Sequence, residues 1–308
     1  MLIPVQSLWV GEKLSELEIL SILSFQKLGH KFILYTYGKV KNIPPNTIIK
    51  NGNHILKKNT LFKFKNSYLP FSDLFRYKLL YLKGGYWVDL DMIALKPLRF
   101  KEKFIFSSER TIQKGPYRNR TKKEISNIGI LKAPPKSNFY KELFDKSLNK
   151  ITKITENIQL MRINRDLIDK YNYNKYVKPA KMFCPLDWWH TKDAFSPLCC
   201  KEIYDVEGYR VDDILKNAYT VHMWRSIMKN RHKINLNDKF EKKSLWERLK
   251  KIVYNKKTKY NKETKKTKYN KETKNTKKTK NSKKAKNSKK AKNSKKAKNS
   301  KKNKKLKN

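Results

Sequence analysis

The stretch IPVQSLWVGEKLSELEILSILSFQKLGHKFILYTYG, residues 3–38, decides the fold class. Its first eight residues form a largely apolar run that stops at a glycine, which predicts a short buried strand. Ser15 then precedes a helical pattern, and Glu18, three residues later, completes a capping box. Gly29 ends the helical pattern, and residues 31–37 are rich in β-forming side chains. A strand, a helix and a second strand in this order predict an α/β fold with a parallel sheet.

Helical and β-like patterns continue to alternate beyond this stretch. We expect a helix from Ser72 to Lys83, closed by Gly84 and Gly85, with a strand following at once over residues 86–90. Further β-like runs lie at 104–107, 128–131 and 218–224, and further helical patterns lie at 136–149, 155–171 and 245–253. The alternation fits one folded domain that ends near residue 254.

The remaining residues, 255–308, differ sharply from this domain in composition. They contain 26 lysines and 2 glutamates, a net charge of +24 out of the +49 of the whole chain. A segment so charged and so poor in apolar residues cannot bury enough surface to offset its chain entropy. The nine residues 256–264 recur as residues 265–273, which is typical of low-complexity expansion. We therefore predict a folded domain over 1–254 and a disordered Lys/Asn-rich tail over 255–308.

The positive charge admits two interpretations. It forms either a solvated surface or a contact for a polyanion such as nucleic acid, an acidic glycan or an anionic membrane. In the domain the charges are scattered along predicted helices, which favours a solvated surface; for the tail both interpretations stay open. The sequence contains no apolar run of transmembrane length and no signal-peptide pattern at its start, so we expect a cytoplasmic location.

Asp89-Leu90-Asp91 is the motif with the clearest chemical meaning. In a strand, residues two apart share a face, so the two carboxylates are expected to point together while Val88 and Leu90 pack inward. Paired carboxylates at a strand end suit a hard divalent cation such as Mg²⁺ or Mn²⁺. The alternative is a pair of surface carboxylates, since chance alone gives about 0.5 Asp-x-Asp matches at this composition. The large apolar residues around the motif favour a functional pair.

Asp73 and Arg76 lie three residues apart on the helix that precedes the motif. They share a helix face and form either a local surface ion pair or a functional pair. In the functional interpretation the arginine faces a phosphate and the aspartate grips hydroxyl groups. Gly84 and Gly85, between the helix and the motif, permit a tight turn or the close approach of a ligand.

The run FSDLFRYKLLYLKGGYWVDLD, residues 71–91, resembles the sugar-binding region of family 32 glycosyltransferases. That family includes capsular-polysaccharide and fungal mannosyl transferases, and it is distantly similar to the glucosyltransferase domains of large clostridial toxins. Weaker similarities lie at residues 3–11, at 126–129 and near 221–224. The resemblance implies a GT-A fold, a nucleoside-diphosphate sugar donor, a glycan or protein-linked acceptor, a divalent metal and retention at the anomeric carbon.

The resemblance also implies roles for individual residues. Asp89 and Asp91 would bind the metal and diphosphate, and Asp73 and Arg76 the donor sugar. Trp9 would stack on the nucleobase, although a core tryptophan at a strand end is an equal alternative. The residues implied for donor binding are Trp9, Asp73, Arg76, Gly84, Gly85 and Asn127. The sequence shows no paired carboxylate nucleophile, so front-face and double-displacement mechanisms both stay open.

His222 or Trp224 is expected to close the donor site, with His222 as a third metal ligand or a hydrogen-bond donor to phosphate, because some GT-A enzymes complete the metal shell from a late segment. In a strand over residues 219–224, His222 would share a face with Thr220 and Trp224. Imidazole is an acceptable ligand for Mn²⁺, although oxygen suits this ion better. The alternative is a partly buried histidine whose ring nitrogen bonds a backbone carbonyl.

Two other functions compete with sugar transfer. A nucleic-acid-binding protein would explain the basic charge, but no RNA-binding, helix-turn-helix or zinc pattern occurs, and the aspartates have no part in it. A metal-dependent phosphotransfer enzyme would use Asp89 and Asp91, but it would not need the helix that carries Asp73 and Arg76.

Overall fold

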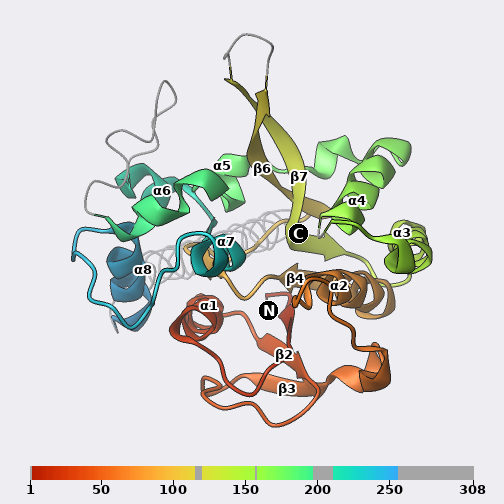
Figure 1. Ribbon diagram of the computed structural model, residues 1–308, viewed down its shortest axis with the longest axis horizontal. Coiled ribbons are helices and arrows are strands. Elements are labelled where there is room, and N and C mark those ends of the chain that lie inside the picture. Colours follow the sequence, from red (N-terminus) through yellow and green to blue (C-terminus); the bar gives the residue numbers. More distant parts are fainter. Residues whose placement is uncertain (1, 115–119, 157, 197–210, 256–308) are drawn as a thin grey trace, which may run out of the picture. The chain divides into compact units, whose positions relative to one another are not determined.

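Six strands form the central sheet, in the order β3-β2-β1-β4-β7-β6 (Figure 1). The computed structural model describes residues 2–114, 120–156, 158–196 and 211–255. The strands of this sheet are β1 Val5–Trp9, β2 Phe32–Thr36, β3 Ile48–Asn51, β4 Gly85–Val88, β6 Ile105–Lys114 and β7 Arg120–Ala133. The first four in sequence run parallel, whereas β7 is antiparallel to both β4 and β6. The expected α/β class with a mainly parallel central sheet is therefore confirmed.

A second, two-stranded sheet lies beside the carboxyl end of β4. It pairs β5, Met92–Ala94, with β8, Thr220–His222, in antiparallel register. Met92 lies opposite His222 in this register. The small sheet therefore holds His222 next to the Asp89-Leu90-Asp91 segment, although about 130 residues separate them in the chain.

Eight α-helices lie within the described ranges (Figure 1). They are α1 Glu16–Lys27, α2 Leu69–Lys83, α3 Asn138–Lys150, α4 Gln159–Lys170, α5 Ala180–Phe183, α6 Val211–Asn217, α7 Arg225–Asn230 and α8 Leu245–Tyr254. Short 3₁₀ segments lie at Gly52–His54, Lys58–Thr60, Ile151–Lys153, Asn174–Tyr176 and Trp188–Phe195. None of the described helices has the length and apolar character needed to cross a membrane.

Both faces of the sheet are buried at β1, β2 and β4, as is usual for parallel strands, whereas the side chains of the edge strand β3 are exposed. Along β2, Phe32 and Leu34 pack into a core with α1, whereas Ile33 and Tyr35 pack on the opposite face with α2 and α3. A third cluster joins α1 and β8 to α8 through the fully buried Trp246. This packing fixes the end of β4, which leads into the predicted metal motif.

Local signals predicted some helix ends and missed others. The capping box forms as expected, with the Ser15 amide donating to Glu18 Oε2 at 2.7 Å. However, α2 begins at Leu69, and Ser72 lies inside its first turn, so the expected N-cap was wrong. The reason is Pro70, whose fixed φ suits the start of a helix.

The predicted domain boundary near residue 254 stays a prediction, because the structure describes the end of the chain only up to residue 255. Residues up to Val253 form one compact unit, and α8 closes it. Residues 256–308 lie outside the described residues, so the disordered tail stays a prediction.

Candidate active site

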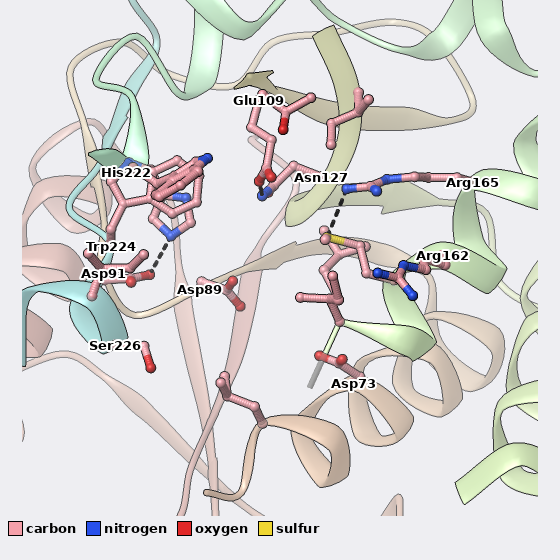
Figure 2. A pocket seen from close by; sticks show the side chains of 18 of the residues that line it. Asp73, Asp89, Asp91, Glu109, Asn127, Arg162, Arg165, His222, Trp224 and Ser226 are labelled. Carbon is pink, nitrogen blue, oxygen red and sulfur yellow. Dashed lines mark hydrogen bonds and ion pairs between the residues drawn. The ribbon is translucent and has the colours of Figure 1, made fainter. Parts of the chain in front are cut away.

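A cavity of about 720 Å³ opens beside the end of β4 (Figure 2). Its wall includes six residues that the sequence singled out: Asp73, Arg76, Asp89, Asp91, Asn127 and His222. These residues come from α2, from the turn after β4, from β7 and from β8. The tertiary structure thus brings the whole predicted metal set and half of the predicted donor-binding set to one surface.

The two aspartates of the motif lie in a turn rather than in a strand. β4 ends at Val88, the Asp89 amide donates to Gly129 O at 2.8 Å, and the Met92 amide closes the turn on Asp89 O at 3.1 Å. The strand alternation expected from sequence was therefore the wrong reason for their shared direction. Leu90 is buried by the turn, and both carboxylates still reach the cavity.

Arg76 ties Asp89 to Asp73 inside the cavity wall. Its Nη1 lies 2.9 Å from Asp89 Oδ1, and its Nη2 lies 3.1 Å from Asp73 Oδ1. Trp87 Nε1 also donates to Asp89 Oδ1 at 2.8 Å. Arg76 is only 3% exposed, so this is a buried network and not a surface ion pair. Such a network is costly to break, because removing one partner leaves an uncompensated buried charge.

Burial sets the protonation behaviour of this network. It raises the pKa of Asp73 to about 7, against the attraction of Arg76, and it also raises the pKa of Asp89. Burial opposes the charge of Arg76, but Asp89 and Asp73 outweigh it and raise the pKa of the guanidinium. The arginine therefore stays charged and helps to hold Asp89 in place.

His222 approaches the other aspartate from the small sheet. Its Nε2 lies 3.2 Å from Asp91 Oδ1, its Nδ1 lies 3.8 Å from the Cys184 thiol, and its ring stacks on Trp224. Its partners are thus side chains and not the backbone carbonyl of the alternative interpretation. Burial alone would raise the pKa of Asp91, but His222 and the Arg225 amide hold it at about 2.

Asp89, Asp91 and His222 together have the donor set of a divalent metal site. One ligand atom from each lies within 4.8 Å of the others. Two carboxylate oxygens and one imidazole nitrogen suit Mn²⁺, and the oxygens suit Mg²⁺. The residues present therefore fit the expected cation, and all three of them line the cavity.

Asn127 and Glu109 form the wall between β6 and β7. Asn127 Oδ1 accepts from the Gly129 amide at 2.6 Å, which orients the Asn127 side chain so that Nδ2 donates to Glu109 Oε2. Burial raises the pKa of Glu109, partly offset by the hydrogen bond from Asn127. Glu109 was not predicted as a site residue, although it closely follows the apolar run 104–106, as the two aspartates follow theirs.

Three predicted donor-binding residues do not line the cavity. Gly84 and Gly85 adopt positive φ angles of 61° and 82° at the turn from α2 to β4. A Cβ at Gly84 would lie 2.5 Å from Pro135 N, so this glycine is required by close chain packing. Trp9 ends β1, and the Arg225 guanidinium lies over its indole ring at 5.2 Å. The Arg225 amide in turn donates to Asp91 Oδ2 at 2.8 Å, which links Trp9 to the cavity wall.

One region in the first half of the chain is similar to a known protein family. Residues 42–112 match a family described as the glycosyltransferase sugar-binding region containing the DXD motif. The matched region includes Asp73, Arg76, Asp89, Asp91 and Glu109, but not Asn127 or His222. No curated protein matches the sequence.

A solved structure named PaToxG Glycosyltransferase is also similar to this chain. It shares 13% identity over 55% of this chain and 70% of its own, with a TM-score of 0.40. A similarity this distant carries no inference about activity.

Proposed function

We propose that this protein transfers a sugar from a nucleoside-diphosphate sugar to a hydroxyl acceptor, with a divalent cation held by Asp89, Asp91 and His222. The observation that carries the proposal is the convergence of these three side chains on one cavity. Two of them lie in the matched sugar-binding region, and the third reaches them from β8. Mn²⁺ is the preferred ion, because an imidazole ligand suits Mn²⁺ better than Mg²⁺.

The residues of the cavity divide the work of binding. When bound, the cation stabilises as a Lewis acid the negative charge that develops on the leaving diphosphate. Asp73, in the lining of the cavity, accepts hydrogen bonds from hydroxyl groups of the donor sugar. Arg76 compensates the charges of Asp73 and Asp89 and keeps both carboxylates oriented. This preorganisation lowers the cost of reorganising the site during reaction.

Glu109 supplies a further polar contact in this account. Its Oε2 is occupied by Asn127, while no described residue donates to its Oε1. A sugar hydroxyl fits this free acceptor, since Glu109 lines the same cavity as Asp89. The resemblance implies retention at the anomeric carbon, and Glu109 is the carboxylate to test for any covalent intermediate.

The experiment is a thermal-shift screen of nucleotides and nucleotide sugars, with and without Mn²⁺. A ligand at 100 times its dissociation constant stabilises the fold by about 2.7 kcal/mol, which is about 5–10 °C for a domain of this size. The proposal expects such a rise with one nucleotide diphosphate series, and only when Mn²⁺ is present. The screen is followed by an assay for release of nucleoside diphosphate from the sugar donor that shifts the midpoint most.

The two competing functions give different results in the same experiments. A nucleic-acid-binding protein would be stabilised by oligonucleotides and not by nucleotide sugars with Mn²⁺. A phosphotransfer enzyme would release inorganic phosphate or a phosphorylated product in place of a free nucleoside diphosphate. Either result would contradict the proposal.

A further inference from the structure

One face of α4 forms a wall of the cavity that the proposed donor chemistry leaves unused. Ile158, Met161, Arg162 and Arg165 follow each other at helical spacing, and all four line the cavity. Figure 2 shows both arginines on the side of the cavity away from His222 and Asp91. Asp91 and His222 therefore lie on one side of the cavity, and the two arginines lie on the other.

The guanidinium of Arg165 is partly buried, and among the described residues no carboxylate lies at ion-pair distance from it, although the more distant Glu109 carboxylate acts to raise its pKa. Its Nε donates to the Ser126 carbonyl at 2.9 Å, and its Nη2 lies 3.6 Å from the Met161 sulfur. Within the described ranges no ion pair includes Arg165, and burial lowers the pKa of its guanidinium. A desolvated charge that is only partly compensated by a distant carboxylate is unfavourable. An anionic ligand would relieve that cost.

Arg162 adds a second, more accessible charge. It pairs with Glu156 at 2.9 Å, but both side chains are about half exposed, at 51% and 52%. An exposed pair of this kind contributes little and is easily exchanged. The two arginines can therefore turn their planar donors toward one ligand, and such donors suit phosphate and carboxylate groups.

Two partly exposed apolar side chains lie in the cavity lining together with the arginines. Ile158 is 43% exposed and Leu69 is 38% exposed, and both line the cavity. Exposed apolar side chains beside two arginines fit a ligand that carries an anionic group next to apolar surface. The donor diphosphate is assigned to the opposite side, at Asp89 and Asp91, so the basic wall is left for the acceptor.

We propose that Arg162 and Arg165 bind an anionic group, a phosphate or a carboxylate, on the hydroxyl acceptor. This inference rests on the proposed function, because it takes the donor to occupy the metal side. It adds the chemical class of the acceptor, which the matched family region does not specify. It also predicts that acceptor binding weakens as salt rises, because the two arginines are partly open to solvent.

The test measures binding of small probes by calorimetry. Glucose, glucuronate and glucose 6-phosphate are titrated into the protein saturated with Mn²⁺ and the nucleoside diphosphate that stabilises it most. The two anionic probes separate a carboxylate from a phosphate preference. We expect at least one of them to bind at least about tenfold more tightly than glucose.

Matched variants assign the binding to the arginines. Arg165→Met and Arg162→Met should each weaken the preferred anionic probe by about tenfold or more. Arg248→Met is the control, because Arg248 pairs with Asp212 and does not line the cavity. The thermal midpoint of each variant shows whether it folds. If Arg165→Met fails to fold, the result for Arg162→Met decides the test.

The inference is overturned if glucose binds as tightly as both anionic probes, if none of the three binds, or if the folded arginine variants bind like the wild type. A failure of the proposed function looks different. It shows as an absence of Mn²⁺-dependent nucleoside diphosphate release from every sugar donor by the wild-type protein.

Discussion

Glu109 is a partly buried carboxylate whose ionisation opposes folding. Burial raises its pKa in the folded protein above the ordinary value of 4.5. Its contribution to stability is therefore fully present below that ordinary value and is lost as the pH rises through the folded value. Glu109→Gln keeps an acceptor for Asn127 without the charge. We expect a higher thermal midpoint than wild type at pH 7 to 8, and no difference near pH 4.

Glu142 provides a control of opposite sign on the surface. Hydrogen bonds from Lys170 and Tyr171 lower its pKa to about 2. Its contribution is thus present above the ordinary pKa and is lost as the pH falls toward the folded value. Glu142→Gln should lower the thermal midpoint slightly at pH 7, because the pairs of this partly exposed side chain are weak. Thermal unfolding followed across pH checks both variants, and a pH-independent difference for Glu109→Gln would refute the argument from burial.

Substitution of His222 tests the proposed metal site of Asp89, Asp91 and His222. Removal of its Nε2, which lies 3.2 Å from Asp91, leaves two carboxylates to hold the cation. His222→Ala should raise the Mn²⁺ concentration for half-maximal activity by at least about tenfold, since even indirect ligand supports cost 10–100-fold. His190→Ala is the matched control, because His190 pairs with Asp193 outside the cavity wall. If His222→Ala has an unchanged Mn²⁺ requirement and an unchanged donor affinity, His222 has only a structural role.

The turn between α2 and β4 depends on Gly84. Its φ of 61° and the 2.5 Å approach of an added Cβ to Pro135 N make any side chain unfavourable. Gly84→Ala should destabilise the protein by at least about 2 kcal/mol. Gly38→Ala is the control, since nothing lies within 4 Å of its added Cβ. Chemical denaturation measures both, and equal stability of the two variants would contradict the packing argument.

Sequence reasoning succeeded where local signals decide an element and failed where tertiary contacts decide it. The capping box at Ser15 depends on residues three apart, and it was predicted. The hairpin of β6 and β7 was predicted only at 104–107 and 128–131, because its outer parts are polar and lack a β-like apolar pattern.

Some features of the candidate site could also be predicted from the sequence, and others could not. The direction of the carboxylates was predicted, but the strand that was to explain it is a turn held by Gly129 O. Arg162 and Arg165 carried no signal, because only the docking of α4 brings them to the cavity. A helix face rich in charge otherwise looks like a solvated surface.

At the scale of the whole molecule, the packing locates the end of the folded unit. Leu245, Trp246 and Leu249 of α8 are fully buried. Deleting residues 255–308 should leave the thermal midpoint and turnover on a small acceptor unchanged, and it should reduce salt-dependent binding to polyanions. Loss of folding in this truncated protein would refute the boundary.

A shorter truncation gives the contrasting result. Ending the chain at Lys243 removes the three buried side chains of α8, and losing a single buried tryptophan already costs about 3–5 kcal/mol. That cost is comparable to the whole stability of a typical domain, about 5–15 kcal/mol. We expect no cooperative unfolding transition by circular dichroism, and a cooperative transition near the wild-type midpoint would contradict the core described for α8.

Nucleoside diphosphate release from the sugar donor with Mn²⁺, compared between wild type and Asp91→Asn, tests the proposed metal-dependent sugar transfer. Asp91 Oδ1 lies 3.2 Å from His222 Nε2, and asparagine keeps the shape of the side chain and its hydrogen bond from the Arg225 amide. Asp145→Asn is the control, because Asp145 is exposed and pairs only with Lys141 on α3. The account predicts at least about a hundredfold loss in Asp91→Asn, with unchanged circular dichroism and a fully active control. Turnover near the wild-type rate in folded Asp91→Asn would contradict it.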